Sequence, residues 1–198
     1  MMDRLLIIGA SGHGKVIADI ARLNGYNSIA FLDDDPELTE CEGYPVIGKC
    51  KDAPEGDIFV AIGNAVTRRA FVELYSDREQ PVLIHPDAVI ADRVSIGKGT
   101  AVMAGVVINP GTTIGEGCII NTCSSVDHDC NIGDYAHISV GSHISGTVDI
   151  GCNTWIGAGS TVINNIEICN DVLLGAGSVV VKDIDKPGKY YGVPARQH

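Results

Sequence analysis

The sequence predicts an α/β fold of two parts: a Rossmann-like domain over residues 1–83, then a parallel β-helix of hexapeptide repeats over residues 84–184, with residues 185–198 as a capping tail. Two observations predict it. An aliphatic residue recurs at every sixth position from Ile84 to Val180 without a miss, and a small or β-branched residue follows each one four positions later. Before this region, apolar runs alternate with glycine-rich turns and amphipathic stretches.

The six-residue period fits neither the 3.6-residue turn of an α-helix nor a heptad, and it is typical of a parallel β-helix. Each unit supplies one short strand and one turn, and three units close a coil whose aliphatic residues point inward. Stacked coils bury a column of isoleucine and valine that no single unit could bury alone. Glycines directly follow many of these aliphatic residues, as at Gly115 and Gly133, where we expect them to ease tight corners.

The amino-terminal region is interpreted as a small parallel sheet with helices. We expect strands at residues 4–9, 28–32 and 57–62, because each run is apolar on both faces, as in buried parallel strands. Helices are expected after the glycine-rich turn at residues 9–15 and after Asn64. This order of elements corresponds to about half of a doubly wound fold.

The loop at residues 9–15 (GASGHGK) is similar to phosphate-binding motifs without matching one fully. It fits GxxxxGK, but position 16 is valine, so the hydroxyl that holds Mg²⁺ in a P-loop is missing. It departs from GxGxxG, and 83 residues cannot supply the second half of a dinucleotide fold. Backbone amides and a helix N-terminus can still bind a phosphate here. Asp33 and Asp34 follow about 20 residues on, where a carboxylate can accept from a ribose or a base; the alternative is a tight turn and a solvated acidic loop.

Composition limits the classes of partner. The net charge of −11 argues against a nucleic-acid partner, which requires clustered lysine and arginine. No apolar run approaches the roughly 20 residues of a membrane span, and the start of the chain lacks the pattern of a signal peptide. The seven cysteines include no CxxC pair, which favours thiols in a reducing compartment. We therefore expect a cytoplasmic protein without a membrane partner.

Six polar residues stand out against the inert repeats: Asn121, Asp127, His128, Asp129, His137 and His143. His128 lies two positions after the inward Val126, at an outward corner between two carboxylates. A carboxylate that accepts from one imidazole nitrogen fixes the tautomer and raises the basicity of the other nitrogen. We predict His128 as a general base oriented by Asp129, with Asp127 as the alternative. Gly146, one coil later, is expected to leave open space beside the imidazole. The histidine spacings do not converge on a zinc site, so no metal is expected.

The order of GASGHG, FLDD, AIGN and a prism containing NTCSSVDHD resembles the bacterial sugar O- and N-acetyltransferases. It is similar to the UDP-4-amino-sugar N-acetyltransferases of bacillosamine-type pathways and to the sialic-acid O-acetyltransferase group. The resemblance implies a left-handed β-helix and a homotrimer with acetyl-CoA held between adjacent prisms. It also implies that the first domain binds a nucleotide sugar. On matching positions it implies these site residues besides His128 and Asp129: Ser11, Gly12 and His13 at the phosphates; Asp33, Asp34 and Gly63 at the nucleoside; Gly146 at the acceptor sugar; and His137, Ala158 and Ala176 at acetyl-CoA.

The prism also offers a groove for the pantetheine arm of CoA. The segments INTCS, ISVGS, IGAGS and LGAGS recur every eighteen residues from Ile120 to Ser178, so they stack on one side, and the upper ones are nearly devoid of side chains. From Gly99 to Val181 there are seven acidic residues and no lysine or arginine. We therefore predict that Lys189 and Arg196 of the tail hold the 3′-phosphate of CoA.

Together these features predict an acetyl-CoA-dependent N-acetyltransferase that acts on the amino group of a nucleotide-linked sugar, a UDP-4-amino-4,6-dideoxy sugar in the first instance. Acetyl transfer to an amine requires a base for the amine proton, a donor for the oxyanion and a groove for pantetheine. Two alternatives remain: an O-acetyltransferase that uses the same base on a sialic-acid-type hydroxyl, and a nucleotide-sugar-binding protein without catalytic activity.

Overall fold

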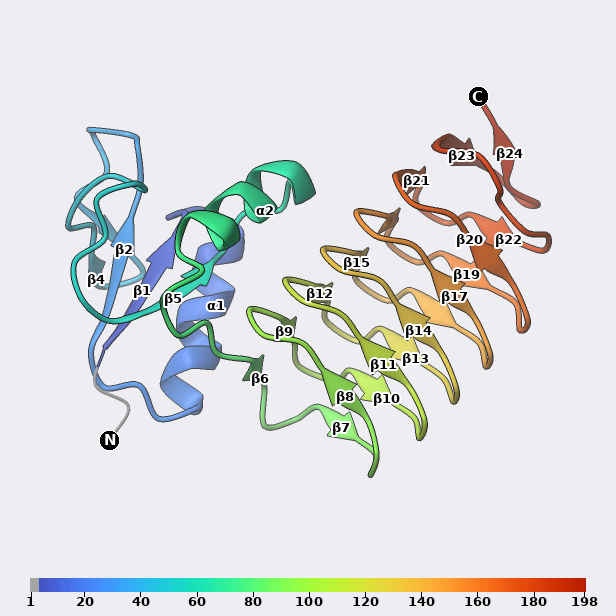
Figure 1. Ribbon diagram of the computed structural model, residues 1–198, viewed down its shortest axis with the longest axis horizontal. Coiled ribbons are helices and arrows are strands. Elements are labelled where there is room, and N and C mark those ends of the chain that lie inside the picture. Colours follow the sequence, from blue (N-terminus) through green and yellow to red (C-terminus); the bar gives the residue numbers. More distant parts are fainter. Residues whose placement is uncertain (1–3) are drawn as a thin grey trace. The chain divides into compact units, whose positions relative to one another are not determined.

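The computed structural model describes residues 4–198 and divides into two compact units, one ending at Pro86 and one running from Asp87 to His198 (Figure 1). The amino-terminal unit contains a parallel three-stranded sheet in the order β2-β1-β5. Its elements are β1 (Leu5–Ile8), α1 (Gly12–Leu23), β2 (Ile29–Leu32), β3 (Glu40–Cys41), β4 (Tyr44–Pro45), β5 (Asp57–Val60), α2 (Ala65–Leu74) and β6 (Leu83–Ile84).

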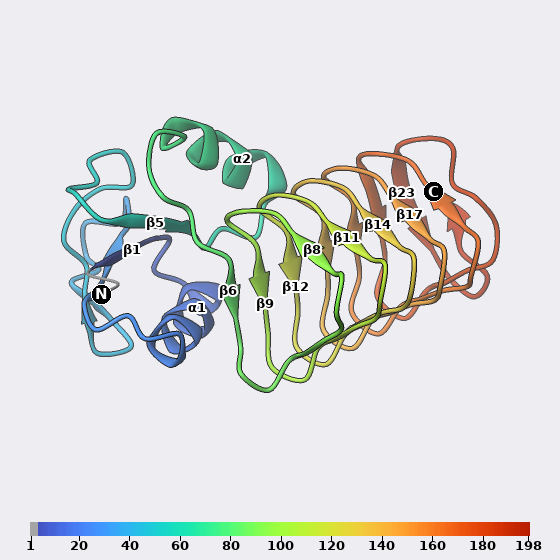
Figure 2. The same ribbon diagram turned by 60° about the horizontal axis from the view of Figure 1, so that its bottom comes forward.

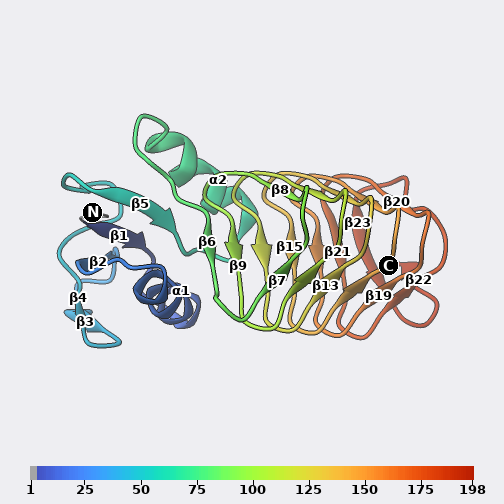
Figure 3. The same ribbon diagram turned by 90° about the horizontal axis from the view of Figure 1, so that it is seen from below.

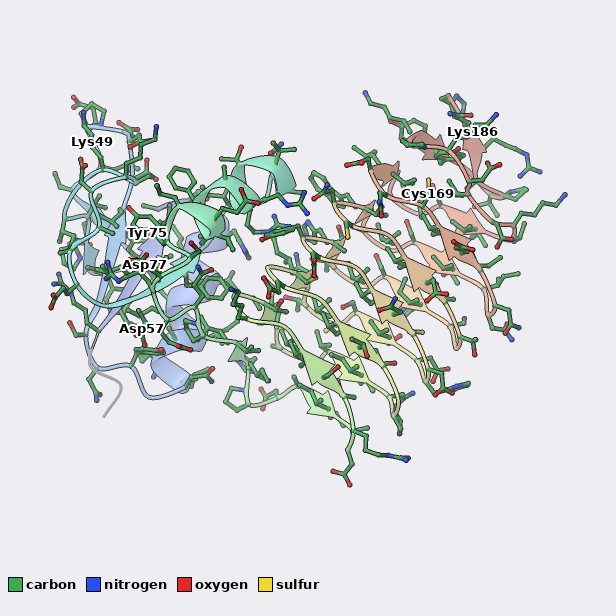
Figure 4. The ribbon with its side chains drawn as sticks, in the orientation of Figure 1. Lys49, Asp57, Tyr75, Asp77, Cys169 and Lys186 are labelled. Atoms are coloured by element: carbon green, nitrogen blue, oxygen red, sulfur yellow. The ribbon has the colours of Figure 1, made fainter. Side chains whose placement is uncertain are left out.

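The core of this unit is formed by the sheet with α1, which packs against β1 and β2, and with α2, which packs against β5 (Figure 3). All four residues of β1 are fully buried, and α1 presents Ile17, Ile20 and Ala21 to the sheet. Polar side chains close the edges of the unit: the Tyr26 hydroxyl donates to Asp57, and the Tyr75 hydroxyl donates to the Cys50 carbonyl (Figure 4). The expected strands and helices are all present.

The hairpin of β3 and β4 lies in a polar stretch for which the sequence predicted no element. Its two turn residues, Glu42 and Gly43, both have positive φ angles, 51° and 78°. That conformation belongs to the two-residue turns that match strand twist, which usually carry Asn-Gly or Asp-Gly. Because glutamate stands at the first turn position, the sequence lacks the usual pattern that predicts a hairpin turn.

The second unit is a parallel β-helix whose coils stack along the chain (Figure 2). Each strand pairs in parallel with the strand eighteen residues further on, as Val107 does with Ser125, until the tail. The first sheet contains β7 (Val89–Ile90), β10 (Val107–Ile108), β13 (Ser125–Val126), β16 (His143–Ile144), β19 (Thr161–Val162) and β22 (Val179–Val180). The second contains β8 (Ser95–Ile96), β11 (Thr113–Ile114), β14 (Asn131–Ile132), β17 (Asp149–Ile150) and β20 (Glu167–Ile168).

The third sheet of the prism contains β9 (Ala101–Val102), β12 (Ile119–Ile120), β15 (His137–Ile138), β18 (Trp155–Ile156) and β21 (Val172–Leu174), and the tail adds β23 (Gly188–Tyr191) and β24 (Arg196–Gln197). Fourteen of the seventeen repeat positions are buried as predicted, because those from Val102 to Val180 are each at most 2% exposed, whereas Ile84, Ile90 and Ile96 at the start of the repeats are only half-buried. The small residues four positions later, such as Cys118 and Cys130, are buried beside them.

The role expected for the glycines after the aliphatic residues needs correction. The left-handed turn residue comes three positions after each aliphatic from Ile90 to Leu174, as at Asp129 and Asn165, and need not be glycine. Gly133 follows Ile132 directly, and a Cβ added to it would lie 2.7 Å from the Cys152 amide nitrogen in the next coil. These glycines are therefore required by the close approach of stacked backbones rather than by the turn.

Neither helix within residues 4–198 has the length and apolar character that crossing a bilayer requires. All seven cysteines are thiols in the structure.

Candidate active site

His128 lies where the chain passes from the first sheet to the second. We call residues 127–130, 145–148 and 163–166, which occupy this position in three successive coils, the His128 corner. The imidazole is exposed, and its Nδ1 lies 2.9 Å from Asp129 Oδ2. A carboxylate can only accept, so Nδ1 carries the proton and Nε2 is the basic nitrogen of the neutral ring. The hydrogen bond to Asp129 is the main reason why the pKa of His128 is raised, with burial opposing it and the nearby carboxylate charges adding to it.

Asp127 has a different task from Asp129. Its Oδ1 accepts from Asn109 Nδ2 at 2.7 Å and from the His128 amide at 2.8 Å. The bond from Asn109, followed by that from the His128 amide, lowers the pKa of the Asp127 carboxyl. Asp127 thus fixes the turn, and Asp129 is the carboxylate that contacts the ring.

Gly146 leaves room for the imidazole itself, and a hollow lies beside the ring. A Cβ on Gly146 would lie 2.5 Å from His128 Nε2, so the ring itself occupies the place that a side chain would take. The open space is a hollow of about 410 Å³ next to the ring, lined by Asp127, His128, Ser145, Gly146, Thr147, Asn164 and Asn165. Within residues 4–198, the Gly146 amide donates no hydrogen bond, whereas its neighbours Ser145 and Thr147 donate to carbonyls of adjacent coils.

His137 lies on the outer side of the third sheet, away from the His128 corner. Its Nε2 is 3.2 Å from Asn121 Nδ2, and its ring stacks on Trp155 of the next coil with centroids 5.2 Å apart and 19° between the planes. His143 is on the first sheet, where its Nδ1 lies 2.9 Å from the Ser125 hydroxyl. The prism therefore separates its three predicted polar histidines onto different faces.

Ala158 and Ala176 lie where the chain passes from the third sheet to the first. We call residues 121–124, 139–142, 157–160 and 175–178 the Ala158 corner. Both alanines are exposed, and within the described chain neither of their amides donates a hydrogen bond. The amides of the following residues, Gly159 and Gly177, each donate to a carbonyl of the coil below, at 2.9 and 2.8 Å. The coils of Ala158 and Ala176 thus each present one unused amide at this corner, as a ligand with amide groups requires.

The two cations predicted to act together in the tail lie on different elements. Lys189 is on β23, in register with Leu173 of the third sheet, and it continues the row that runs through His137 and Trp155. Arg196 is on β24 and lines a hollow of about 310 Å³ with Lys182 and Asp183. Figure 4 labels Lys186 in the same last coils.

The glycine loop of the first unit owes its shape to two glycines. Gly9 has a φ of 102°, and a Cβ on Gly14 would collide with the Gly9 carbonyl oxygen and touch Phe31. Ser11 is the N-cap of α1 and is exposed, as is Gly12. His13 is different: burial, and then the charge of Arg68, lower its pKa to about 4, so it is neutral at physiological pH. Its buried Nε2 meets no hydrogen-bond partner among the described residues.

The acidic residues after β2 serve the loop first. Asp33 Oδ2 accepts from the Ala10 amide at 2.7 Å, and Oδ1 accepts from the Asp35 amide at 3.0 Å. Asp34 accepts through Oδ1 from the Cys50 amide, which is its single acceptor bond within residues 4–198, and it is exposed. Gly63 is also exposed, and its carbonyl accepts from the buried Arg68 guanidinium. Of the two carboxylates, Asp34 therefore retains the greater capacity to accept from a ligand.

Sequence reasoning missed some of the residues that line the hollow or contact the predicted site. Asn164 and Asn165 lie two coils above His128, and eighteen-residue spacing could have indicated them. Trp155 is the single tryptophan of the chain, eighteen residues from His137, and this spacing was a usable signal. No group of three His, Cys, Asp or Glu residues within residues 4–198 is arranged to hold a metal ion.

Two family models match the chain. The PglD N-terminal domain matches residues 4–75, and the bacterial transferase hexapeptide with six repeats matches residues 147–182. A curated UDP-N-acetylbacillosamine N-acetyltransferase of Bacillus subtilis (strain 168) is 33% identical over 113 residues. That match spans 52% of this chain and 52% of the relative, about half the length of each.

Solved structures match over nearly the whole chain. The acetyltransferase domain of PglB from Neisseria gonorrhoeae FA1090 is 40% identical with a TM-score of 0.94, covering 98% of this chain and 99% of that one. The same domain in complex with acetyl coenzyme A is 41% identical with a TM-score of 0.93, covering 98% of each chain. PerB from Caulobacter crescentus in complex with CoA and GDP-perosamine is 37% identical with a TM-score of 0.92, covering 98% of this chain and 96% of that one.

Proposed function

Since the chain belongs to the hexapeptide-repeat sugar acetyltransferases that carry a PglD-type N-terminal domain, we propose that it transfers the acetyl group of acetyl-CoA to the amino group of a nucleotide-linked 4-amino sugar. The observation that carries the proposal is the His128–Asp129 pair: an exposed imidazole that lines a hollow while its Nδ1 is held by a carboxylate. The relatives support the substrate class, because PerB was solved with CoA and a GDP-linked sugar and the Bacillus subtilis relative is named for a UDP-linked sugar.

The chemistry follows from this geometry. The neutral His128 Nε2 takes a proton from the sugar amine as the amine nitrogen attacks the thioester carbonyl carbon. The carbon–sulfur bond then breaks, and the imidazolium returns its proton to the departing CoA thiolate, so that protons balance over the cycle. The Gly146 amide is the proposed oxyanion donor, because Gly146 packs against the His128 ring and its amide donates to no group among residues 4–198.

Asp129 is proposed to keep His128 in the productive tautomer. With Nδ1–H bound to the carboxylate, Nε2 is left as the proton acceptor, and the imidazolium that forms is stabilised by the adjacent negative charge. The same contact raises the pKa of His128, which makes it a stronger base.

Acetyl-CoA is proposed to lie along the Ala158 corner. The unused amides of Ala158 and Ala176 can donate to the carbonyls of the pantetheine arm. Three coil steps separate His137 from Lys189 along the row through Trp155, about 14 Å at the usual strand spacing. The thioester would lie near His137, and the phosphates would lie at the cations of the tail, Lys189 on one side and Arg196 on the other.

The site is incomplete in one chain, which is the reason for proposing a homotrimer. The His128 corner and the Ala158 corner are separated by the whole first sheet of the prism. A base on one corner cannot serve a thioester on the other unless a second copy brings its Ala158 corner to the first copy's His128. Mixed trimers test this: a His128→Ala chain and an Ala158→Trp chain, each inactive alone, should restore part of the activity when they are unfolded and refolded together.

The amino-terminal unit is proposed to bind the nucleotide. The exposed Ser11 and Gly12 at the start of α1 suit the phosphates, with the neutral His13 beside them. Asp34, with one carboxylate oxygen unused, and Gly63 suit the nucleoside, while Asp33 acts by holding the loop at Ala10. We also propose a reducing cytoplasm as the compartment, because seven cysteines remain thiols.

The testing experiment measures release of CoA thiol with acetyl-CoA and a panel of acceptors: UDP- and GDP-linked 4-amino sugars and sialic acid. We expect release with a nucleotide-linked 4-amino sugar and an acetamido product by mass spectrometry. Release with sialic acid alone would replace the proposal by O-acetylation. Binding of a nucleotide sugar without release by any acceptor would leave a binding protein. His143→Ala is the matched control for His128→Ala, because both are exposed histidines of the prism.

A further inference from the structure

Trp155 is an aromatic residue in an unusual place. It is the single tryptophan of the chain, it stands at an outward position of β18, and it is 43% exposed. Its indole stacks on His137, its register partner in β15, and its Nε1 donates to Ser139 Oγ at 2.7 Å. Two contacts of different kinds therefore fix the indole over the coil that contains His137.

The other side of His137 is also fixed. The Thr122 amide can only donate, and it donates to Asn121 Oδ1 at 2.8 Å, which sets the orientation of the Asn121 side chain. Asn121 Nδ2 then faces His137 Nε2 at 3.2 Å, so Nε2 must accept and the proton of the neutral ring is on Nδ1. The two hydrogen bonds from Thr122 to Asn121 and from Asn121 to His137 thus select one tautomer of His137, as long as the imidazole stays in this plane.

We infer that Trp155 is a positioning residue for acetyl-CoA: by stacking on His137 it holds the imidazole in the plane in which Nε2 meets Asn121, and so keeps the thioester end of the CoA site in one arrangement. The inference rests on the proposed function for its ligand. Rotation or tilt of the imidazole would break either the stack on Trp155 or the bond from Asn121, so the two contacts support each other. The hydrogen bond to Ser139 keeps the indole from turning away with the ring.

The test uses the purified full chain with Trp155→Ala, Trp155→Phe and, as a control, Thr113→Ala, which removes an outward side chain of the second sheet. Affinity for CoA, UDP and GDP is measured by calorimetry. The tautomer of His137 is read from its ring ¹⁵N shifts by NMR, with His137→Gln to assign the signal. In the wild type we expect the Nδ1–H form alone.

Trp155→Ala should weaken the affinity for CoA about three- to tenfold, the range expected for the loss of an aromatic pair. His137 should then show both tautomers in its ¹⁵N shifts, while the affinities for UDP and GDP stay unchanged. Trp155→Phe keeps a stacked ring, so it should restore most of the CoA affinity and the single tautomer, which a purely structural loss would not explain. The inference is overturned if Trp155→Ala binds CoA as the wild type does, or if His137 keeps one tautomer in that variant. If the wild type binds no CoA, the proposed function itself fails.

Discussion

Replacing Gly146 by alanine is the most informative single change, because it moves one catalytic group without disturbing the backbone ladder. The new Cβ would lie 2.5 Å from His128 Nε2 and 2.6 Å from Cε1. Ordinary contact begins at 3.4 Å, so the imidazole must move by about 1 Å. The ring is exposed and can swing outward, which would break or lengthen its bond to Asp129.

A displacement of about 1 Å at a reacting group costs on the order of 100-fold in rate. We therefore expect kcat/KM for acetyl transfer to fall about 100-fold in Gly146→Ala. The melting temperature and the affinity for CoA should stay close to those of the wild type, because Gly146 has no positive φ angle and the clash is with a movable side chain. Thiol release and calorimetry measure the two effects.

Gly133→Ala is the matched comparison, since its Cβ would meet the backbone of the next coil at Cys152 and Gly151. That variant should lose stability rather than catalysis alone. The reasoning is refuted if Gly146→Ala keeps more than a third of the wild-type kcat/KM, or if its loss of activity is matched by a loss of folded protein.

Three further changes separate the other roles. Asp129→Asn removes the main cause of the raised His128 pKa. Because the base acts when neutral, activity rises with pH through that pKa, so the acidic limb of the kcat/KM–pH profile should move to lower pH. An acidic limb that stays in place or moves to higher pH would contradict this role. Arg196→Ala and Lys189→Ala should each raise the KM for acetyl-CoA about two- to fivefold, the range of exposed ion pairs. Neither variant should change the KM for acetyl-3′-dephospho-CoA. An equal rise in KM with both acetyl donors would show that the residue does not bind the 3′-phosphate. Ile138→Ala, at a fully buried repeat position, should lower the free energy of unfolding by about 2–5 kcal/mol. Ile163 is 37% exposed, so Ile163→Ala should lower that free energy much less. Thermal or denaturant unfolding measures both values, and equal losses would contradict the core assignment.

The prism could be predicted almost residue by residue, because a six-residue period without a slip leaves one register. Every aliphatic position from Val102 to Val180 lies in the column for that reason. The structural role of the glycines that follow the aliphatic residues could not be predicted correctly. The six-residue period shows which residues share a corner, but it does not show how closely the backbones of two stacked coils approach. Gly133 shows this: its constraint comes from Cys152, nineteen residues away.

The candidate site was predictable to the level of its corner and no further. The sequence places His128 between two carboxylates and leaves Asp127 as an alternative to Asp129 for orienting the ring. The structure decides between them because Asn109, in the coil below, donates a hydrogen bond to Asp127, whereas Asp129 contacts the imidazole. The double use of Asp33 by backbone amides was equally hidden, because it requires the loop at Ala10 to fold back onto the end of β2. The hairpin at Glu42 was missed because its turn carries an uncommon residue.

The most direct test of the account is acetyl transfer by His128→Ala beside the wild type, with both substrates saturating. The account predicts that thiol release falls at least about 100-fold, the contribution of a general base, while CoA and the nucleotide sugar bind as before and His143→Ala keeps full activity. Retention of most of the activity by His128→Ala, with normal binding of both ligands, would contradict it.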